Sequence, residues 1–135
     1  MVDVLTAAQR RKNMQRIRSK DTKPELRVRR LVHALGYRYR LHGKGIPGRP
    51  DLVFRPRKKA IFVHGCYWHM HACPLGRVAP ATNAEFWREK REGNVRRDAA
   101  NLEKLREQGW SALVIWQCEI ADEKPLTKRI REFLG

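Results

Sequence analysis

Ile61-Phe62-Val63-His64-Gly65-Cys66-Tyr67-Trp68-His69-Met70-His71-Ala72-Cys73 is the stretch of this 135-residue chain in which potential ligand side chains are concentrated. It holds three of the five histidines and two of the three cysteines, with two adjacent aromatic side chains among them. The apolar run from Ile61 to Val63 predicts a β-strand. Because an ordinary core strand does not carry so many ligand-type side chains, we expect this strand to end at a functional site.

The charge of the chain indicates its partner. Lysine and arginine number 30 against 14 acidic residues, which gives a formal net charge of +16 and a pI near 10.7. A surplus of this size favours nucleic acid, with an acidic protein partner or a ribosome-like role as the alternatives. The length suits a single domain, residues 1–135, with one modest core.

The hydropathy pattern bears on location and assembly. No apolar stretch reaches the roughly 18 residues that cross a bilayer, and none follows the N-terminal arginines as in a secretory signal. We therefore expect a cytoplasmic protein with no membrane partner, in which three cysteines favour metal ligation over disulfides. The lack of an apolar surface helix favours a monomer.

Helix and strand signals alternate along the chain. The basic segment 1–20 is expected to clamp DNA phosphates, the alternative being a solvated charged helix. A capping box at Thr22–Glu25 begins a helix that ends before Gly36. Strands are predicted at 37–41, 52–54, 61–63 and 111–116, the last a central strand because its apolar run is unbroken.

The second half of the chain adds more helices. A capping box at Thr82–Glu85 begins a helix that Gly93 is expected to break or bend, and helices follow at about 94–108 and from Pro125 to Leu134. This order predicts an α/β/α sandwich around a central mixed β-sheet. Neighbouring strand ends would gather Asp51, the 63–73 stretch and Cys118 at one edge of the sheet.

Four of these side chains match a zinc site. Cys66, His71 and Cys73 lie within eight residues, and Cys118 is the remaining cysteine. A Cys3His set is a closed pattern of structural zinc, although the usual pair of cysteines two residues apart is missing. The alternative is three buried free cysteines and an unrelated histidine. Zinc would tie a ligand-rich loop to the last strand.

Other side chains indicate a hydrolytic centre. Asp51 and Glu25 offer the oxygen ligands that Mg²⁺ prefers, although Glu25 can also serve only as a helix cap. His64 and His69 are left when zinc takes His71, and a histidine near the cation can accept a proton from water. With a nucleic-acid partner, these residues indicate metal-assisted phosphodiester hydrolysis. The neighbouring pair at 67 and 68 is suited to base stacking.

The chain resembles the very short patch repair (Vsr) family of DNA mismatch endonucleases. The resemblance rests on Pro47-Gly48-Arg49-Pro50-Asp51 and the 61–73 stretch, and it extends over nearly the whole chain. Further matching residues are Lys12–Met14, Glu25, Glu85–Trp87, Lys90, Asn94, Val95, Asp98, Gly109–Trp116 and Cys118.

The resemblance implies a restriction-endonuclease-like fold with a structural zinc, and a Mg²⁺-dependent nick 5′ to the thymine of a T·G mismatch. Asp51 and the main-chain carbonyl of Val63 would hold Mg²⁺, and His69 would be the general base. Glu25 and His64 would support the metal-bound waters or the base. The remaining implied roles are zinc ligation by Cys66, His71, Cys73 and Cys118, wedging into DNA by Tyr67, Trp68, Trp87 and Met14, and contact with the mismatched pair by Lys90 and Asn94.

The resemblance also implies partners: duplex DNA with a T·G mismatch, mismatch-repair proteins and, functionally, a cytosine-5 DNA methyltransferase near the bacterial nucleoid. Two departures stand out. Valine replaces the threonine frequent at position 63, which a main-chain ligand tolerates, and Val63-His64-Gly65 replaces the acid-x-lysine pair of restriction nucleases. A restriction-type or structure-specific nuclease, and a non-catalytic zinc-containing DNA-binding module, remain the alternatives.

Overall fold

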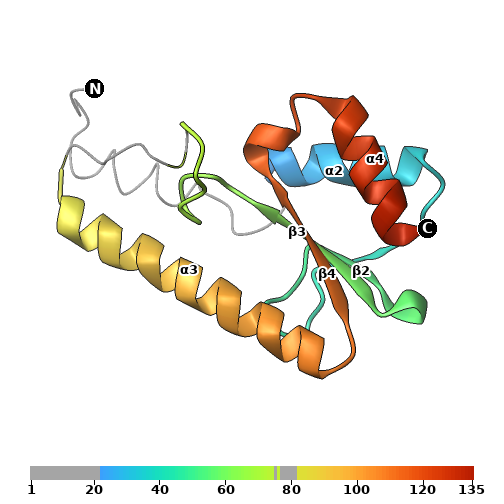
Figure 1. Ribbon diagram of the computed structural model, residues 1–135, viewed down its shortest axis with the longest axis horizontal. Helices are drawn as coiled ribbons and strands as arrows, with labels where there is room; N and C mark the ends of the chain where they lie inside the picture. The colour runs from blue at the N-terminus through green and yellow to red at the C-terminus, as the bar shows by residue number, and fades with distance from the viewer. Residues whose placement is uncertain (1–21, 75, 77–81) are drawn as a thin grey trace.

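The structure, a computed structural model, describes residues 22–74, 76 and 82–135. Helices α2 and α4 lie on one side of the β-sheet and α3 lies on the other (Figure 1), which confirms the predicted α/β/α sandwich. The clamp predicted for residues 1–20, Met14 included, lies outside the described residues. The elements in order are α2 (Lys23–Ala34), β1 (Arg40–Leu41), β2 (Leu52–Phe54), β3 (Lys59–His64), α3 (Ala84–Glu107), β4 (Ser111–Trp116) and α4 (Glu123–Leu134), with 3-10 helices at Arg55–Arg57 and Gln117–Glu119.

The described strands form a mixed sheet in the order β1-β2-β3-β4. The first three strands pair antiparallel, and α3 leads from β3 to a parallel β4 that sets Val63 beside Ile115. The prediction that 111–116 is a central strand is wrong, because β4 is an edge of this described sheet and β3 is internal. An unbroken apolar run reports that both faces of a strand are covered, but it does not report the strand's neighbours.

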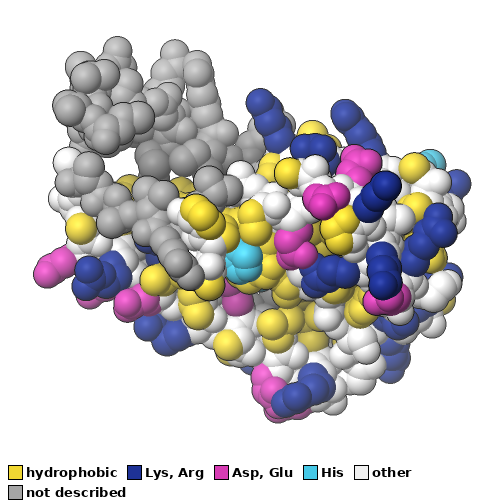
Figure 2. Space-filling model, turned by 45° about the horizontal axis from the view of Figure 1, so that its top comes forward, with side chains coloured by type: hydrophobic (Ala, Val, Ile, Leu, Met, Phe, Trp, Pro, Cys, Tyr) yellow, Lys and Arg dark blue, Asp and Glu magenta, His cyan; other side chains and the backbone are white. Residues whose placement is uncertain are grey.

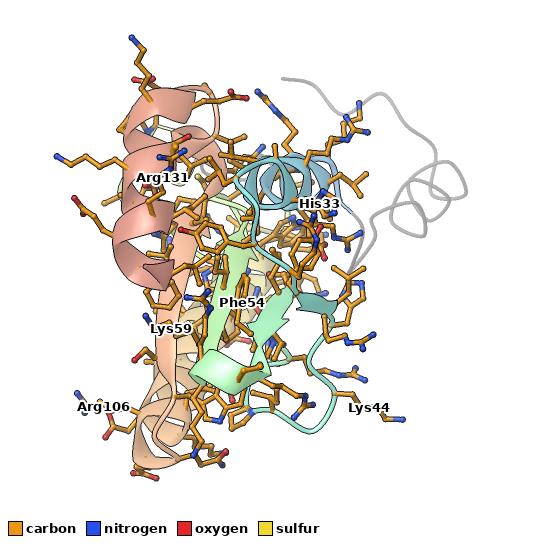
Figure 3. The ribbon with its side chains drawn as sticks, turned by 90° about the vertical axis from the view of Figure 1, so that its right-hand side faces the viewer. His33, Lys44, Phe54, Lys59, Arg106 and Arg131 are labelled. Carbon is orange, nitrogen blue, oxygen red and sulfur yellow. The ribbon has the colours of Figure 1, made fainter. Side chains whose placement is uncertain are left out.

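Side chains alternate between two cores, as the period of a strand requires. Leu52, Ile61 and Ile115 face the α2/α4 layer and are fully buried. Phe62 faces α3, where it packs with Leu105. In Figure 3, Phe54 points into the molecule beneath the helices, whereas Lys44 and Arg106 project from its edge. The hairpin β2–β3 thus contributes side chains to both cores, and this packing holds the ends of its two strands in place.

The helix boundaries partly follow the predictions. The Thr22 capping box is present, since Thr22 Oγ1 accepts from the Glu25 N–H at 3.4 Å and Glu25 Oε2 accepts from the Thr22 N–H at 3.4 Å. The second capping box is not, because Asn83 (φ +51°) is the N-cap of α3 and makes no side-chain cap. Within the described residues, no helix has both the length and the apolar character needed to cross a membrane.

Gly93 neither breaks nor divides α3, which is continuous, so that prediction is also wrong. Glycine inside a helix costs only about 1 kcal/mol relative to alanine. Tertiary contacts on either side of it offset this cost: Arg91 Nε donates to the Tyr67 carbonyl at 2.7 Å, and Asn94 Nδ2 donates to the Trp68 carbonyl at 3.0 Å. The last helix starts at Glu123, before the predicted Pro125.

Candidate active site and metal centres

The Gly/Pro loop between β1 and β2 places Asp51. The loop is closed by bonds from the Gly43 N–H to the Pro50 carbonyl (2.9 Å) and from the His42 N–H to the Asp51 carbonyl (3.2 Å). Gly48 (φ +80°) packs so closely on α3 and β3 that a Cβ there would lie 2.9 Å from Phe62 Cε1. Asp51 is therefore held at the start of β2, beside the end of β3.

The Asp51 carboxylate lies in an environment that disfavours its charge. Its Oδ2 accepts one hydrogen bond, from the Val63 N–H at 2.6 Å. Burial raises the pKa of the carboxyl to about 7; the Val63 N–H opposes this rise and the nearby Glu25 carboxylate adds to it. Two carboxylates that face each other at a strand end are stabilised by a bound cation. Asp51 and Glu25 therefore fit a divalent metal.

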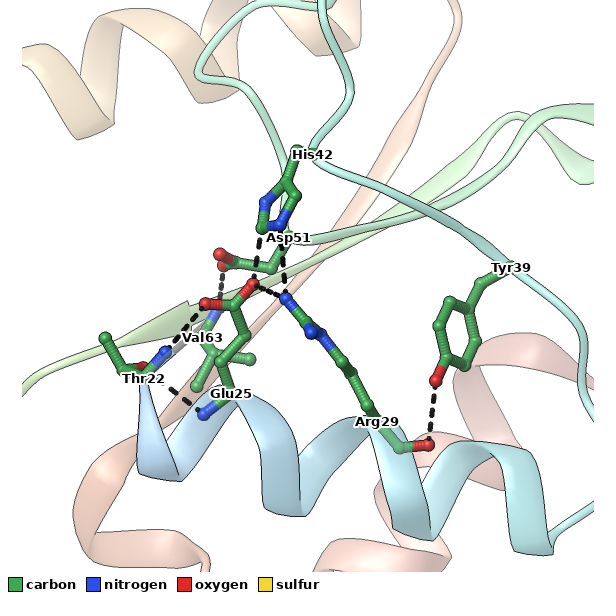
Figure 4. Close-up of polar contacts among 7 residues, drawn as sticks. All are labelled: Thr22, Glu25, Arg29, Tyr39, His42, Asp51 and Val63. Atoms are coloured by element: carbon green, nitrogen blue, oxygen red, sulfur yellow. Dashed lines mark hydrogen bonds and ion pairs between the residues drawn. The ribbon is translucent and has the colours of Figure 1, made fainter. Parts of the chain in front are cut away.

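Glu25 is almost fully buried and connects several elements (Figure 4). Arg29 Nη2 donates to Glu25 Oε1 at 2.6 Å and to His42 Nε2 at 3.2 Å. His42 Nδ1 lies 3.6 Å from the same carboxylate oxygen. Glu25, His42 and Asp51 form a group that could hold a metal, with ligand atoms within 4.8 Å of one another. Glu25 is therefore more than a helix cap.

His42 was not among the site residues predicted from the sequence. Its signal was its position directly after the first strand of the sheet, opposite Asp51 across the β1–β2 connection. The Arg29 guanidinium bridges Glu25 and His42. The residues that could hold the cation thus come from α2, from the loop and from the strand pair.

His69, predicted as the general base, is bonded to an aspartate of α3. Its Nδ1 makes a hydrogen bond with Asp98 Oδ2, and since the carboxylate can only accept, Nδ1 carries the proton. No role was predicted for Asp98 from the sequence; its signal was its spacing of four residues from Asn94, one helical turn along the same face of α3. This pairing leaves His69 Nε2 available as an acceptor.

His64 stacks on His69, with ring centroids 3.9 Å apart and ring planes 4° from parallel. Burial, and secondarily the adjacent His69, lower the His64 pKa to about 4, with Asp98 acting in the opposite direction. His64 Nδ1 is buried without a hydrogen-bond partner among the described residues and lies 4.0 Å from Asp98 Oδ2. A neutral His64 therefore supports the ring of His69 without adding positive charge.

These groups share one pocket. A cavity of about 180 Å³ is lined by residues that include Arg49, Asp51, Val63, His64, His69 and Asp98. The Asp51 carboxylate and the His69–Asp98 pair therefore reach the same small volume from different elements. Such an arrangement can hold a cation and accept a proton from a water molecule beside it.

The structure brings together the four predicted zinc ligands Cys66, His71, Cys73 and Cys118, with ligand atoms within 4.8 Å of one another. Cys118 Sγ lies 3.5 Å from His71 Nδ1, and none of the cysteines forms a disulfide. With Zn–S near 2.3 Å and Zn–N near 2.0–2.1 Å, a tetrahedral zinc would set a sulfur and a nitrogen ligand about 3.5 Å apart. The four side chains fit the ion.

A row of aromatic rings lies beside the pocket. Ring centroids are 5.1 Å apart for Tyr67 and Trp68, 5.6 Å for Trp68 and Trp87, and 5.1 Å for Trp87 and Phe86. Phe86 is 59% exposed, and it was not among the predicted DNA-binding residues. Lys90 Nζ lies 5.6 Å from the Trp87 ring centroid. The structure thus places Tyr67, Trp68 and Trp87 together, with Lys90 beside them.

Basic side chains extend over the surface. On the face shown in Figure 2, Lys and Arg predominate over Asp and Glu across the right-hand part, where α2 and α4 lie in Figure 1. A positive surface of this kind attracts a phosphate backbone. Of the predicted DNA contacts, Asn94 Nδ2 donates to the Trp68 carbonyl. Its contact with a mismatched pair, like the other site roles, remains a prediction.

A mixed sheet lies between helices, Asp51 and His69 line one pocket at its strand ends, and Glu25 lies beside Asp51. This architecture is that of the restriction-endonuclease-like fold. The fold is similar to that of a solved structure, the catalytic domain of homing endonuclease I-Bth0305I, with a TM-score of 0.59 at 23% identity; the match covers 84% of this chain and 94% of that one. This likeness confirms the fold.

Sequence comparison identifies the family. The family model "DNA mismatch endonuclease Vsr" matches residues 2–75. The chain is 46% identical to the type II nicking enzyme V.XorIIP of Xanthomonas oryzae, over 99% of this chain and 98% of that protein. It is 41% identical to the DNA mismatch endonuclease Vsr of Escherichia coli, over 99% and 88%. The chain belongs to the Vsr family of DNA endonucleases, as the resemblance predicted.

Proposed function

We propose that this endonuclease nicks duplex DNA 5′ to the thymine of a T·G mismatch by Mg²⁺-dependent hydrolysis of the phosphodiester. The observation that carries the proposal is the pocket in which the Asp51 carboxylate and the His69–Asp98 pair meet. Its position beside a row of aromatic side chains supports a substrate whose bases can be unstacked. Membership of the Vsr family supports the mismatch as the target.

Asp51 and the main-chain carbonyl of Val63 would hold Mg²⁺, and Glu25 and His42 would lie next to the ion. The fit rests on the raised pKa of the Asp51 carboxyl, which reports a buried negative charge that the protein alone does not balance. When bound, the cation would polarise the phosphate and lower the pKa of a bound water. Glu25 keeps its carboxylate oriented through Arg29 and the Thr22 N–H.

His69 takes the proton from the attacking water through Nε2. Asp98 accepts a hydrogen bond from the Nδ1–H, which fixes the tautomer and stabilises the imidazolium that forms. His64, stacked in parallel, restricts the rotation of the His69 ring. General-base catalysis of this kind contributes about 10²–10⁴-fold to a rate. It replaces the acid-x-lysine chemistry that the end of β3 lacks.

Tyr67, Trp68 and Trp87 would enter the duplex beside the mismatch, and Met14 would enter from the opposite side. Unstacking a base step costs a few kcal/mol, and less at a mismatch than in a paired duplex. The aromatic row would therefore select T·G partly by its deformability. Lys90 and Asn94, on the face of α3 that meets the row, would contact the mismatched bases.

The four cysteine and histidine ligands would hold zinc as a structural ion. Cys118 follows β4 and the other ligands follow β3, so the ion would join the ends of the two parallel strands. The Cys118 N–H already points to Cys66 Sγ at 3.3 Å, as expected for a thiolate ligand that accepts a backbone hydrogen bond. Zinc would thereby fix the turn that carries His69 and the aromatic pair.

The test is a nicking assay on matched T·G and T·A duplexes with Mg²⁺. We expect a single-strand break 5′ to the mismatched thymine and no break in the T·A duplex. Equal cleavage of both duplexes would favour a restriction-type or structure-specific nuclease on this scaffold. Binding without any cleavage would favour a non-catalytic zinc-containing module. Cleavage of a library of duplexes, each with one T·G pair in a different flanking sequence, would define the sequence context that the enzyme requires. We expect this context to match the recognition sequence of the partner methyltransferase.

A further inference from the structure

Arg49 is the residue of the Pro47–Asp51 motif whose presence the metal site does not explain. Its φ of +46° lies in the left-handed region, which non-glycine residues other than asparagine and aspartate rarely adopt. Gly48 before it has φ +80°, and the buried Pro50 after it has a fixed φ. A strained backbone at a motif residue points to a function for its side chain.

The loop that carries Arg49 is pinned on all sides. The Arg49 N–H donates to the Ile46 carbonyl at 3.0 Å, and the Gly43 N–H donates to the Pro50 carbonyl at 2.9 Å. Gly48 allows the backbone to touch β3 and α3, where an added Cβ would lie 3.1 Å from Asn101 Cβ. The direction in which the Arg49 side chain leaves the loop is therefore fixed by the fold.

Arg49 lines the same pocket as Asp51, His69 and Asp98. Among the described residues that line this pocket, it is the one lysine or arginine. The side chain is exposed, and no hydrogen bond or ion pair joins its guanidinium to another described residue. A cation is thus presented to a pocket whose other titratable lining residues are aspartates and histidines, without being used to hold the fold.

Such a cation assists phosphodiester hydrolysis. The phosphate brings a negative charge into a pocket lined by two aspartates, and the transition state concentrates further charge on its non-bridging oxygens. Restriction-type nucleases meet this need with the lysine of their acid-x-lysine pair, but Gly65 stands at that position here. The planar guanidinium of arginine matches two phosphate oxygens at once.

We propose that Arg49 binds the non-bridging oxygens of the scissile phosphate and stabilises the charge that develops on them during hydrolysis. This inference rests on the proposed function of the pocket. It assigns the transition-state role of the missing lysine to a residue of a different element, the loop before β2. Arg49 would act together with the bound Mg²⁺, from the side of the phosphate nearer to α3 and Gly48.

Single-turnover nicking of a prebound T·G duplex tests the role. Arg49→Ala should lower the rate constant about 10²–10³-fold, the usual cost of removing one transition-state donor, while the Kd for DNA rises only a few-fold. Arg49→Lys should recover part of the rate. Arg49→Gly removes the guanidinium and relieves the positive φ, so it should remain folded and be as slow as Arg49→Ala.

Lys58 offers a matched control, because it is also an exposed basic residue with positive φ (+52°), but it lies in the turn before β3 and does not line the pocket. Lys58→Ala should nick at the wild-type rate. If Arg49→Ala or Arg49→Gly nicks within about threefold of wild type, the catalytic role is wrong. A fall in DNA affinity with an unchanged rate in the bound complex would also overturn it.

A binding measurement identifies the phosphate without requiring cleavage. A series of T·G duplexes is prepared, each with one phosphate near the mismatch replaced by an uncharged methylphosphonate. The Kd of the protein for each duplex is measured with Ca²⁺ in place of Mg²⁺. Wild type should lose affinity when the phosphate 5′ to the thymine is neutral, and Arg49→Ala should be insensitive at that position only. Equal sensitivity in both proteins would overturn the proposal. If wild type loses affinity for the neutral phosphate and Arg49→Ala does not, the contact between Arg49 and this phosphate is supported even when wild type fails to nick. Failure of the proposed nicking activity can therefore be distinguished from failure of the Arg49 proposal.

Discussion

Asp51→Asn should make the metal-free protein more stable while abolishing nicking. Burial raises the pKa of the Asp51 carboxyl from 3.8 to about 7, so at pH 8 the folded protein holds a charge that it disfavours. At about 1.36 kcal/mol per pKa unit, this sets a ceiling of about 4 kcal/mol on the gain from a neutral side chain. Since Asp51 is half-buried and borders an open pocket, we expect about 1–2 kcal/mol.

The pH dependence gives this prediction its sign. An aspartate whose pKa is raised by folding carries no penalty below pH 3.8, a growing penalty as the pH rises to about 7, and a constant one above that. The stability difference between Asp51→Asn and wild type should therefore be largest at pH 8. It should decrease as the pH falls from about 7 towards 3.8, because the folded wild type then takes up a proton at this site.

Thermal unfolding at pH 5–9, with stoichiometric zinc and without Mg²⁺, measures the effect. An increase in Tm of about 3–8 °C is expected at pH 8. Asp122→Asn is the matched control, because Asp122 is an exposed N-cap residue and asparagine caps equally well. Adding Mg²⁺ should stabilise wild type, by about 2.7 kcal/mol at a hundred times its Kd, and leave Asp51→Asn unchanged. A Tm at or below that of wild type at pH 8 would refute the reasoning.

Three further predictions concern the pocket and its supports. His69→Ala should reduce nicking by about 10²–10⁴-fold and keep zinc, whereas His71→Ala should lose zinc and unfold at lower temperature; metal analysis and unfolding curves distinguish them. Asp98→Asn should slow single-turnover nicking at least tenfold with little change in the Kd for DNA, since the tautomer of His69 is no longer fixed. Gly48→Ala should lower the Tm, because its Cβ would lie 2.9 Å from Phe62 Cε1 at φ +80°; an unchanged Tm would show that the loop can move.

Much of the fold could be predicted because its signals are local. The strands around Ile61 and 111–116 follow from apolar runs, and the start of α2 follows from the Thr22 capping box. The position of β4 at an edge of the described sheet could not be predicted, because strand order depends on the crossover through α3 and not on composition. The helix break predicted at Gly93 was wrong because glycine destabilises a helix only slightly, and the tertiary contacts around it offset this cost.

The site was predictable where its residues share a stretch and missed where tertiary structure assembles it. The zinc set follows from counting cysteines, and the structure places His71 with them. His42 and Asp98 lie in segments whose local pattern is ordinary, a strand end and a charged helix face. His42 reaches Glu25 and Asp51 because β1 pairs with β2, and Asp98 reaches His69 because α3 packs across the end of β3. Their positions in the sequence are only weak signals for such contacts.

Trp116, the last residue of β4, connects the histidines of the two predicted metal sites. The His71 ring stacks on its indole at 4.2 Å, with ring planes 15° apart, while the His64 and His69 rings meet it edge-on at 5.2 and 6.3 Å. The indole is thus packed against the predicted zinc ligand His71 and against the predicted general base His69. If zinc binds at its four predicted ligands, it would fix the end of β4 and, through the Trp116 ring, the position of His69. Zinc would then affect catalysis through geometry alone.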